Sequence, residues 1–242
     1  DIQSLAMIPT LTFLSLYDFD SIATQLSSVY CLFSAPHLQN LDLQLSAMLA
    51  SDVITVLMQT LPTNNILKNL RLTLPGTAGS SNITSIEFAE LLCVKFPHLR
   101  HLYLCSANSG IDPLVVKTLI TKHASLESLH LKMMKPVDSI KFEQTLSEVL
   151  PIAYKLKELY INCYTLILSD AMWSYLAQNK TLEILMLYGV RAVNAQHAVT
   201  GLSQMKQLRH LVLYEEMVKQ EEQRALLAHA LAQLKSLYFV QY

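Results

Sequence analysis

FPHLRHLYLCS, at residues 96–106, contains the pattern that decides the fold. Its leucines Leu99, Leu102 and Leu104 form the phrase L-x-x-L-x-L, which recurs along the whole chain. The other copies begin at Leu11, Leu38, Leu67, Leu126, Leu156, Leu182, Leu208 and Leu234, with Ile161 and Phe239 as the last letters of two of them. Subtracting successive starting positions gives spacings of 27, 29, 32, 27, 30, 26, 26 and 26 residues. A period of about 20 to 50 residues predicts a protein built from stacked repeats.

Each copy of the phrase predicts one short strand. Its last two apolar letters alternate with other residues, as a strand with one buried face requires. The segments between strands carry apolar residues at helical spacing, for example at positions 53, 54, 57 and 61 and at positions 114, 115, 119 and 120. One strand–helix unit cannot bury its apolar face alone, but stacked units share a continuous core. We therefore predict an α/β solenoid of about nine units, with a parallel sheet on the concave face and helices on the convex face.

Capping residues and prolines predict where the helices begin and end. Thr84 and Glu87 match a capping box, and Asp112 followed by Pro113 matches an N-cap with proline in the first turn. Prolines at positions 9, 36 and 97 each stand two residues before the first leucine of a repeat. A helix must end there before the next strand begins.

The repeat resembles the leucine-rich-repeat family over the whole chain. Units of 26–32 residues with a full helix are similar to its ribonuclease-inhibitor-like and F-box-associated classes, and fit its short extracellular class poorly. The family's asparagine or cysteine after the strand is matched by Asn162, Cys163 and Cys105 but is missing from most units, which predicts irregular turns. The resemblance implies that residues 1–242 form a single horseshoe-shaped domain.

The two ends of the chain predict that it is a fragment of a longer protein. Apolar residues at positions 2, 5, 6 and 8 have the spacing of a helix whose own strand is missing, and the chain stops directly after its ninth strand. A solenoid normally has polar end caps, which neither end provides here.

The composition argues against several classes of function. Charged residues make up 15% of the chain and the formal net charge is −1, whereas binding to nucleic acid needs many lysine and arginine contacts to phosphate. No apolar run approaches the ~18 residues of a membrane span. The four cysteines lie far apart without a CxxC pair, which is typical of a reducing compartment. We expect a cytoplasmic or nuclear protein that binds neither nucleic acid nor membrane.

Sequence motifs for catalysis and for cofactor binding are missing from the chain. It has no GxxxxGK[ST], GxGxxG or HExxH motif, and its five glycines leave little room for phosphate-binding loops. Two Asn-x-Thr sequons, at Asn82 and Asn179, are as many as the composition gives by chance. We predict no catalytic residue, no cofactor and no metal.

Three letters of each repeat are expected to face solvent on the concave side. They are the third, fifth and seventh letters of L-x-x-L-x-L-x, which makes 27 positions in nine units. These positions hold six of the chain's 11 tyrosines, where an even distribution would place roughly one. Tyrosine combines a large, stiff contact area with a hydrogen bond, which is typical of binding surfaces. The alternative is that aromatic residues simply favour strands.

The predicted binding residues are thirteen members of these columns. They are Tyr17, Asp42, Arg71, His101, Tyr103, His130, Lys132, Glu158, Tyr160, Tyr188, His210, Tyr214 and Tyr238. Because neighbouring strands lie about 4.8 Å apart, Tyr103, His130 and Tyr160 are expected to form a continuous row, with Tyr188 and Tyr214 as a second pair. We predict that this surface binds a protein or peptide.

A metal site or a Cys–His nucleophile at His101, Cys105 and His130 is the sharper alternative. Against it, no carboxylate is placed to orient either histidine, and an open sheet does not exclude water. The remaining histidines before strands are expected to be ordinary surface residues: His37, His98 and His123. Trp173, at helical spacing from Leu176, is expected to lie in the core between helix and sheet.

The sequences of the individual repeats also resemble those of a functional class. FPHLRHLYL, SLESLHL and LKELYI are similar to phrases of F-box leucine-rich-repeat proteins. The resemblance implies a substrate receptor of a ubiquitin ligase, in which an F-box upstream of this chain would bind the Skp adaptor. Two alternatives stay open: a sensor domain of a NACHT-type immune receptor or a microbial effector with a similar array, and an enzyme whose array only positions substrate for a separate catalytic domain.

Overall fold

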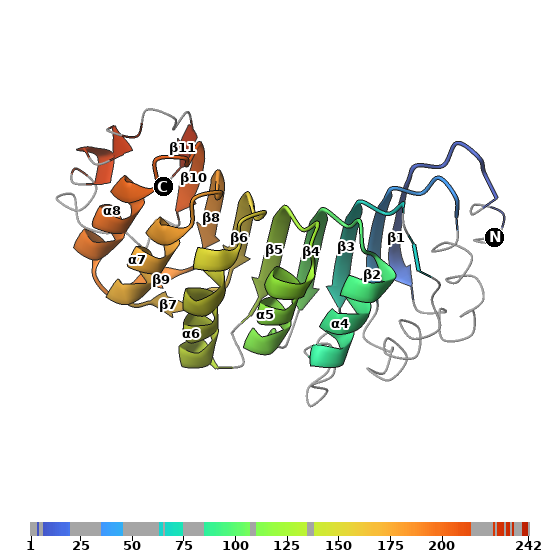
Figure 1. The fold of residues 1–242 in the computed structure, drawn as a ribbon, viewed down its shortest axis with the longest axis horizontal. Helices are drawn as coiled ribbons and strands as arrows, with labels where there is room; N and C mark the ends of the chain where they lie inside the picture. Colours follow the sequence, from blue (N-terminus) through green and yellow to red (C-terminus); the bar gives the residue numbers. More distant parts are fainter. Residues whose placement is uncertain are drawn as a thin grey trace.

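The chain forms an arc of strands with helices along one side (Figure 1). The structure is a computed structural model that describes residues 4, 7–19, 35–45, 63–64, 66–74, 85–106, 110–134, 138–213, 225, 227–229, 231–232, 234 and 239–241. The helix predicted around positions 53–61 and the apolar residues at positions 2, 5 and 6 lie outside these residues.

Within the described residues, nine parallel strands form one continuous sheet. They are β1 (Phe13–Phe19), β2 (Asn40–Leu45), β3 (Asn69–Leu74), β4 (His101–Ser106), β5 (Ser128–Met133), β6 (Glu158–Asn162), β8 (Ile184–Tyr188), β10 (His210–Leu213) and β11 (Phe239–Gln241). Their order in the sheet is their order in the chain. The predicted solenoid, with a parallel sheet and alternating helices, is confirmed.

The described helices lie between strands in the chain and cover one face of the sheet (Figure 1). They are α4 (Ile86–Lys95), α5 (Pro113–Lys122), α6 (Ser139–Val149) with the 3-10 turn η3 (Leu150–Ile152), α7 (Asp170–Gln178) and α8 (Ala195–Gln204). A second, two-stranded sheet joins β7 (Ile167–Leu168) to β9 (Arg191–Ala192). This small sheet was not predicted, because its two-residue strands carry no periodic signal.

The repeats pair in the predicted register from β1 to β10, except that the pairing of β1 with β2 shifts by one residue between Leu16 and Phe19. On the third letter, for example, His101 pairs with Asn69 on one side and Ser128 on the other. The last strand departs from this register: the sequence places Ser236 beside His210, but Phe239 pairs there instead, three residues further along. In the described sheet β11 is hydrogen-bonded on one side only, so a single neighbour fixes its register.

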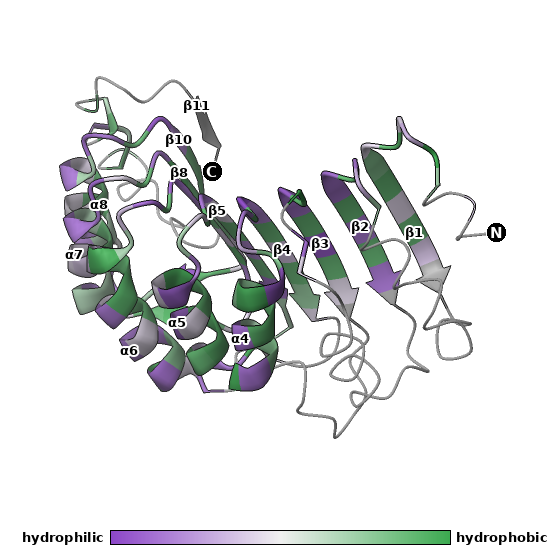
Figure 2. Ribbon diagram, turned by 45° about the vertical axis from the view of Figure 1, so that its right-hand side comes forward, coloured by the Kyte–Doolittle hydropathy of each residue, from purple (hydrophilic) through white to green (hydrophobic). Residues whose placement is uncertain are grey.

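The leucines of the repeated phrase form the core. Leu99, Leu102 and Leu104 are 0%, 1% and 3% exposed, and the corresponding residues of β2, β3, β5, β6, β8 and β10 are at most 6% exposed. In the first repeat, Leu11 and Leu16 are only partly buried. In Figure 2 the strands alternate in green and purple bands, as one buried and one solvent-facing side require. Burial of each leucine stabilises the fold by about 1.5–3 kcal/mol. Trp173 of α7 is also fully buried, as predicted.

Helix starts agree with the sequence in one case and differ in another. Asp112 caps α5, accepting a hydrogen bond from the Leu114 backbone N–H at 2.8 Å, with Pro113 in the first turn as predicted. The cap of α4 is Ser85, which accepts from the Phe88 backbone N–H at 3.3 Å. The helix therefore begins one residue later than predicted, and Phe88 instead of Glu87 holds the third helical position that a capping box requires. Thr84 lies outside the described residues.

The buried face of α5 is rotated from the predicted stripe. Val115, Val116 and Leu119 pack into the core, whereas Leu114 is exposed. The proline at the start of the helix occupies the core position of the first turn instead. The stripe prediction was therefore wrong at Leu114.

Buried polar side chains hydrogen-bond to backbone groups in several connections from helix to strand. Asn179 is 1% exposed; its amide donates to the Leu150 carbonyl at 2.7 Å, and its Oδ1 accepts from the Thr181 and Leu182 backbone N–H groups at 2.9 and 2.8 Å. Asn64 holds the corresponding position, three residues before the first leucine, and also accepts two backbone N–H groups.

His123 holds the same position in its own repeat, so the prediction that it is a surface residue was wrong. It is 4% exposed, and its Nε2 lies 2.9 Å from the Phe96 carbonyl oxygen. Burial lowers the pKa of His123 below its usual value, so the ring is neutral at pH 7 and donates from Nε2.

Charged side chains form a ladder at the second letter of the repeats. Glu127 pairs with Lys157 at 3.0 Å and with Arg100 at 3.7 Å, and Glu183 pairs with Arg209 at 3.3 Å. The hydrogen bond from Lys157 lowers the pKa of Glu127. Such exposed pairs contribute roughly 0–1 kcal/mol each, so they favour the register without holding the fold together.

Asn179→Ala is expected to lower the free energy of unfolding by about 3 kcal/mol, because it leaves buried carbonyl and N–H groups without partners. Urea unfolding at pH 7 measures this loss, with Gln178→Ala, at the exposed neighbouring position, as the control. Equal stability of the two variants would contradict the buried hydrogen bonds described here.

Gly201→Ala in α8 tests the packing of α8 on α7. An added Cβ would lie 2.7 Å from both the Cβ and the carbonyl oxygen of Trp173, so the helices must move apart. We expect a net loss of about 2 kcal/mol from this overpacking, although alanine favours a helix by about 1 kcal/mol over glycine. Thr200→Ala, on the exposed side of α8, is the matched control in thermal unfolding. A gain in stability for Gly201→Ala would contradict the packing.

Candidate functional site

A groove with a volume of about 540 Å³ crosses the concave side from β1 to β6. Its lining consists of third- and fifth-letter side chains over a floor of core leucines. The lining residues are Phe13, Asn40, Leu41, Asp42, Asn69, Leu70, Arg71, His101, Leu102, Tyr103, Ser128, His130, Glu158 and Tyr160. Seven of the predicted binding residues are among them: Asp42, Arg71, His101, Tyr103, His130, Glu158 and Tyr160.

Five fifth-letter side chains, Asp42, Arg71, Tyr103, His130 and Tyr160, form the concave row. They stand side by side because their strands pair in register. Arg71 Nε lies 3.7 Å from Asp42 Oδ1, and the Arg71 guanidinium lies 4.2 Å from the centre of the Tyr103 ring. Arg71 is therefore held between a carboxylate and an aromatic face, a combination that favours a guanidinium over an ammonium group.

The aromatic half of the concave row continues without a gap. The rings of Tyr103 and His130 are 6.0 Å apart at 56°, and His130 stacks on Tyr160 with the ring centres 3.4 Å apart at 28°. Sequence spacing predicted this row of three, and the structure confirms that the three rings are neighbours. The row presents a stiff surface that loses little side-chain freedom when a ligand binds.

Burial sets the charge state of the row. It lowers the pKa of His130 to about 4, with the positive charges of His101 and Arg71 acting in the same direction. Burial also raises the pKa of the Tyr103 phenol, and the nearby Cys105 thiol raises it further. At pH 7 both rings are therefore neutral, and the charges of the concave row are those of Asp42 and Arg71.

Three outward positions are more buried than predicted. Ser128, Cys105 and Val212 stand in the concave columns but are 1%, 7% and 3% exposed. The expectation that Cys105 faces solvent was therefore wrong. Ser128 lines the groove and its Oγ has no hydrogen-bond partner.

Two asparagines extend the third-letter column at the other end of the groove. The Asn69 amide donates to Asn40 Oδ1, and the Asn40 amide donates to the Thr12 carbonyl at 3.1 Å. With Phe13 and Ser128, these residues line the groove but were not among the predicted binding residues. These residues stand in the same outward columns of the repeat, which was the signal available in the sequence. The prediction selected mainly tyrosines and charged residues from those columns and therefore omitted them.

The other predicted binding residues lie outside the groove lining. Tyr17 is exposed on β1, and its hydroxyl donates to Asp42 Oδ2 at 3.4 Å. Lys132, Tyr188 and His210 lie on β5, β8 and β10, with Lys132 exposed and the other two half-buried. Tyr214 and Tyr238 lie outside the described residues, so their pairing with this surface stays a prediction.

No cluster of three or more histidine, cysteine, aspartate or glutamate side chains in the described part of the chain is arranged to hold a metal ion. None of the helices that the structure describes is long and apolar enough to cross a membrane.

Comparison with known proteins supports the fold by structure alone. No protein-family profile matches this chain, and no curated protein matches its sequence. Among solved structures, it is similar to an internalin, InlF, from Listeria monocytogenes, with 15% identity and a TM-score of 0.53 over 100% of this chain and 64% of the internalin chain. It is also similar to a chain of the Rad7–Elc1 complex from yeast, with 15% identity and a TM-score of 0.57 over 99% of this chain and 65% of that chain.

This chain spans less than two thirds of the length of either structural neighbour. At 15% identity the likeness concerns the backbone arrangement and not the surface side chains. The fold is thereby established as a leucine-rich-repeat solenoid.

The stacked His130 provides a direct test of the concave row. Its folded pKa of about 4 lies below the ordinary 6.5, so between these values the unfolded chain binds a proton that the folded chain excludes. Its contribution to stability is therefore complete above about pH 6.5 and is lost as the pH falls toward 4. We expect the NMR titration of the His130 ring to have its midpoint near pH 4, with His130→Gln used to assign the signal. A midpoint near 6.5 would show that the ring is not buried in the stack.

Proposed function

We propose that this chain is a non-enzymatic module that binds a protein or peptide on the concave face of its sheet. The single observation that carries the proposal is the concave row, in which two charged and three aromatic side chains from five strands form one continuous surface along a groove of about 540 Å³. The groove is open rather than enclosed, which suits a macromolecule better than a small molecule.

The dimensions of the concave row fit an extended peptide. Five neighbouring strands about 4.8 Å apart span roughly 19 Å, the length of about six extended residues. Contacts between the members of the row fix their rotamers before a ligand arrives, which reduces the entropy cost of binding. Tyrosine and arginine are also the residue types that most often dominate binding energy at protein interfaces.

A more specific form of the proposal is a substrate receptor of an F-box ubiquitin ligase. The similarity of the repeat phrases to F-box leucine-rich-repeat proteins supports it, and so does the structural likeness to a chain of the Rad7–Elc1 complex. In this form the concave face would bind the substrate, and an upstream F-box would bind the Skp adaptor. The reaction itself would be carried out by other proteins.

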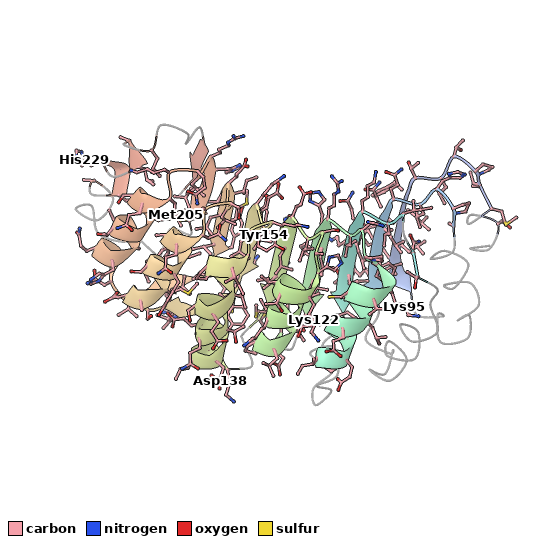
Figure 3. All side chains as sticks on the ribbon, in the orientation of Figure 1. Lys95, Lys122, Asp138, Tyr154, Met205 and His229 are labelled. Carbon is pink, nitrogen blue, oxygen red and sulfur yellow. The ribbon has the colours of Figure 1, made fainter. Side chains whose placement is uncertain are left out.

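Tyr103→Glu with Tyr160→Glu tests the proposal by placing two charges in the aromatic half of the concave row. Affinity capture from a native extract is expected to lose the partner bound by the unchanged chain, and the purified partner should then bind the double variant at least tenfold more weakly. Tyr154→Glu is the control, since Tyr154 is exposed in the connection after η3 (Figure 3). Equal binding by the unchanged chain and the double variant, with both folded, would contradict a concave site.

A further inference from the structure

The groove has a carboxylate near each end, and the two have different surroundings. Asp42, toward the β1 end, has a cation beside it within the chain: Arg71 Nε lies 3.7 Å from its Oδ1, and the Tyr17 hydroxyl donates to its Oδ2 at 3.4 Å, although Oδ1 accepts no hydrogen bond. Arg71 in turn lies over the ring of Tyr103. This end of the groove already contains a carboxylate, a guanidinium and an aromatic face in contact.

Glu158, at the β6 end, has no cation beside it that corresponds to Arg71 beside Asp42. It is half-buried and lines the groove, but it takes part in none of the ion pairs or hydrogen bonds found among the described residues. Of the basic side chains on this face, Arg71 pairs with Asp42, and neither Lys132 nor His101 forms an ion pair with Glu158.

Ser128 supplies a second, independent sign that this end of the groove is incomplete. It pairs in register with Glu158 on the neighbouring strand and lines the groove. The residue is only 1% exposed, and its Oγ has no hydrogen-bond partner. A buried hydroxyl without a partner costs free energy that a ligand with suitable N–H groups would recover.

Tyr160 provides an aromatic surface beside these oxygens. It stands two residues after Glu158 on the same side of β6, so about 7 Å separates their Cα atoms. His130, which stacks on Tyr160, is neutral at pH 7 because burial lowers its pKa to about 4. The stack therefore adds no positive charge that would repel a cation at this position.

We infer that the end of the groove formed by Ser128, Glu158 and Tyr160 binds an arginine side chain of the partner. The inference rests on the proposed function and specifies the partner's chemistry: a segment with arginine at the position that reaches β6. A guanidinium offers several N–H donors in one plane and a flat face for an aromatic ring, so it matches a carboxylate, a hydroxyl and a tyrosine together. Arg71, between the carboxylate of Asp42 and the ring of Tyr103, shows two of these three contacts inside the chain.

A library of eight-residue peptides tests the inference whatever the sequence of the natural partner. Each position carries arginine, lysine, glutamate or glutamine in turn against a random background, and binding is measured to the unchanged chain. We expect enrichment of arginine over lysine at one position. For a selected arginine peptide, Glu158→Gln should raise the Kd by about tenfold or more, as expected for a lost charge-assisted hydrogen bond.

Glu127→Gln is the matched control, since it removes a carboxylate from the neighbouring repeat that is engaged with Lys157 and Arg100 outside the groove. It should change the Kd by less than about twofold, within the range of a surface charge. Thermal unfolding of each variant shows that the effect does not come from loss of the fold. Glu158→Lys should reverse the selection toward glutamate at the same position.

The outcomes separate the inference from the proposed function. Peptides selected without arginine preference, whose binding is lost in the Tyr103→Glu/Tyr160→Glu variant, would overturn the inference and leave the concave site in place. Arginine preference that survives Glu158→Gln, or enrichment of lysine or of acidic residues, would also overturn it. Peptide binding that is unchanged in every variant of the concave face would contradict both the inference and the proposed function.

Discussion

Parallel hydrogen bonding in a fixed register is the constraint on which the rest of the structure depends. Because each strand repeats the same phrase, residues with the same letter form straight columns across the sheet. The leucine columns become the core, and the third and fifth letters become one continuous surface. Asp42, Arg71 and Tyr103 are therefore in contact, although each belongs to a different repeat. Both the groove and the concave row are direct consequences of this alignment.

Most of the fold could be predicted from the sequence for the same reason. A leucine phrase with regular spacing specifies strands, their order and their register, because a slip of one residue would expose every leucine. It also predicted that Tyr103, His130 and Tyr160 are neighbours. The geometry within the row could not be predicted, since the stacking of His130 on Tyr160 depends on rotamers that only the packed neighbours determine.

The errors arise where burial depends on neighbours rather than on the repeat letter. Ser128 and Cys105 occupy outward positions, yet they are only 1% and 7% exposed. The sequence neighbours of His123 are typical of a surface connection. Only comparison with Asn64 and Asn179, which stand at the same repeat position, would have indicated that its side chain is buried and hydrogen-bonded. The predicted register of β11 was wrong by three residues, since Phe239 and not Ser236 pairs with His210.

Photocrosslinking tests the central claim, that the concave face is the binding surface, most directly. Benzoylphenylalanine would replace His101, which is exposed on the concave side, and separately Tyr154, which is exposed in the connection after η3. Both variants would be irradiated in a native extract, and the crosslinked products identified by mass spectrometry. The account predicts a discrete protein adduct from position 101 and none from position 154. A specific adduct from position 154 with none from position 101 would contradict it.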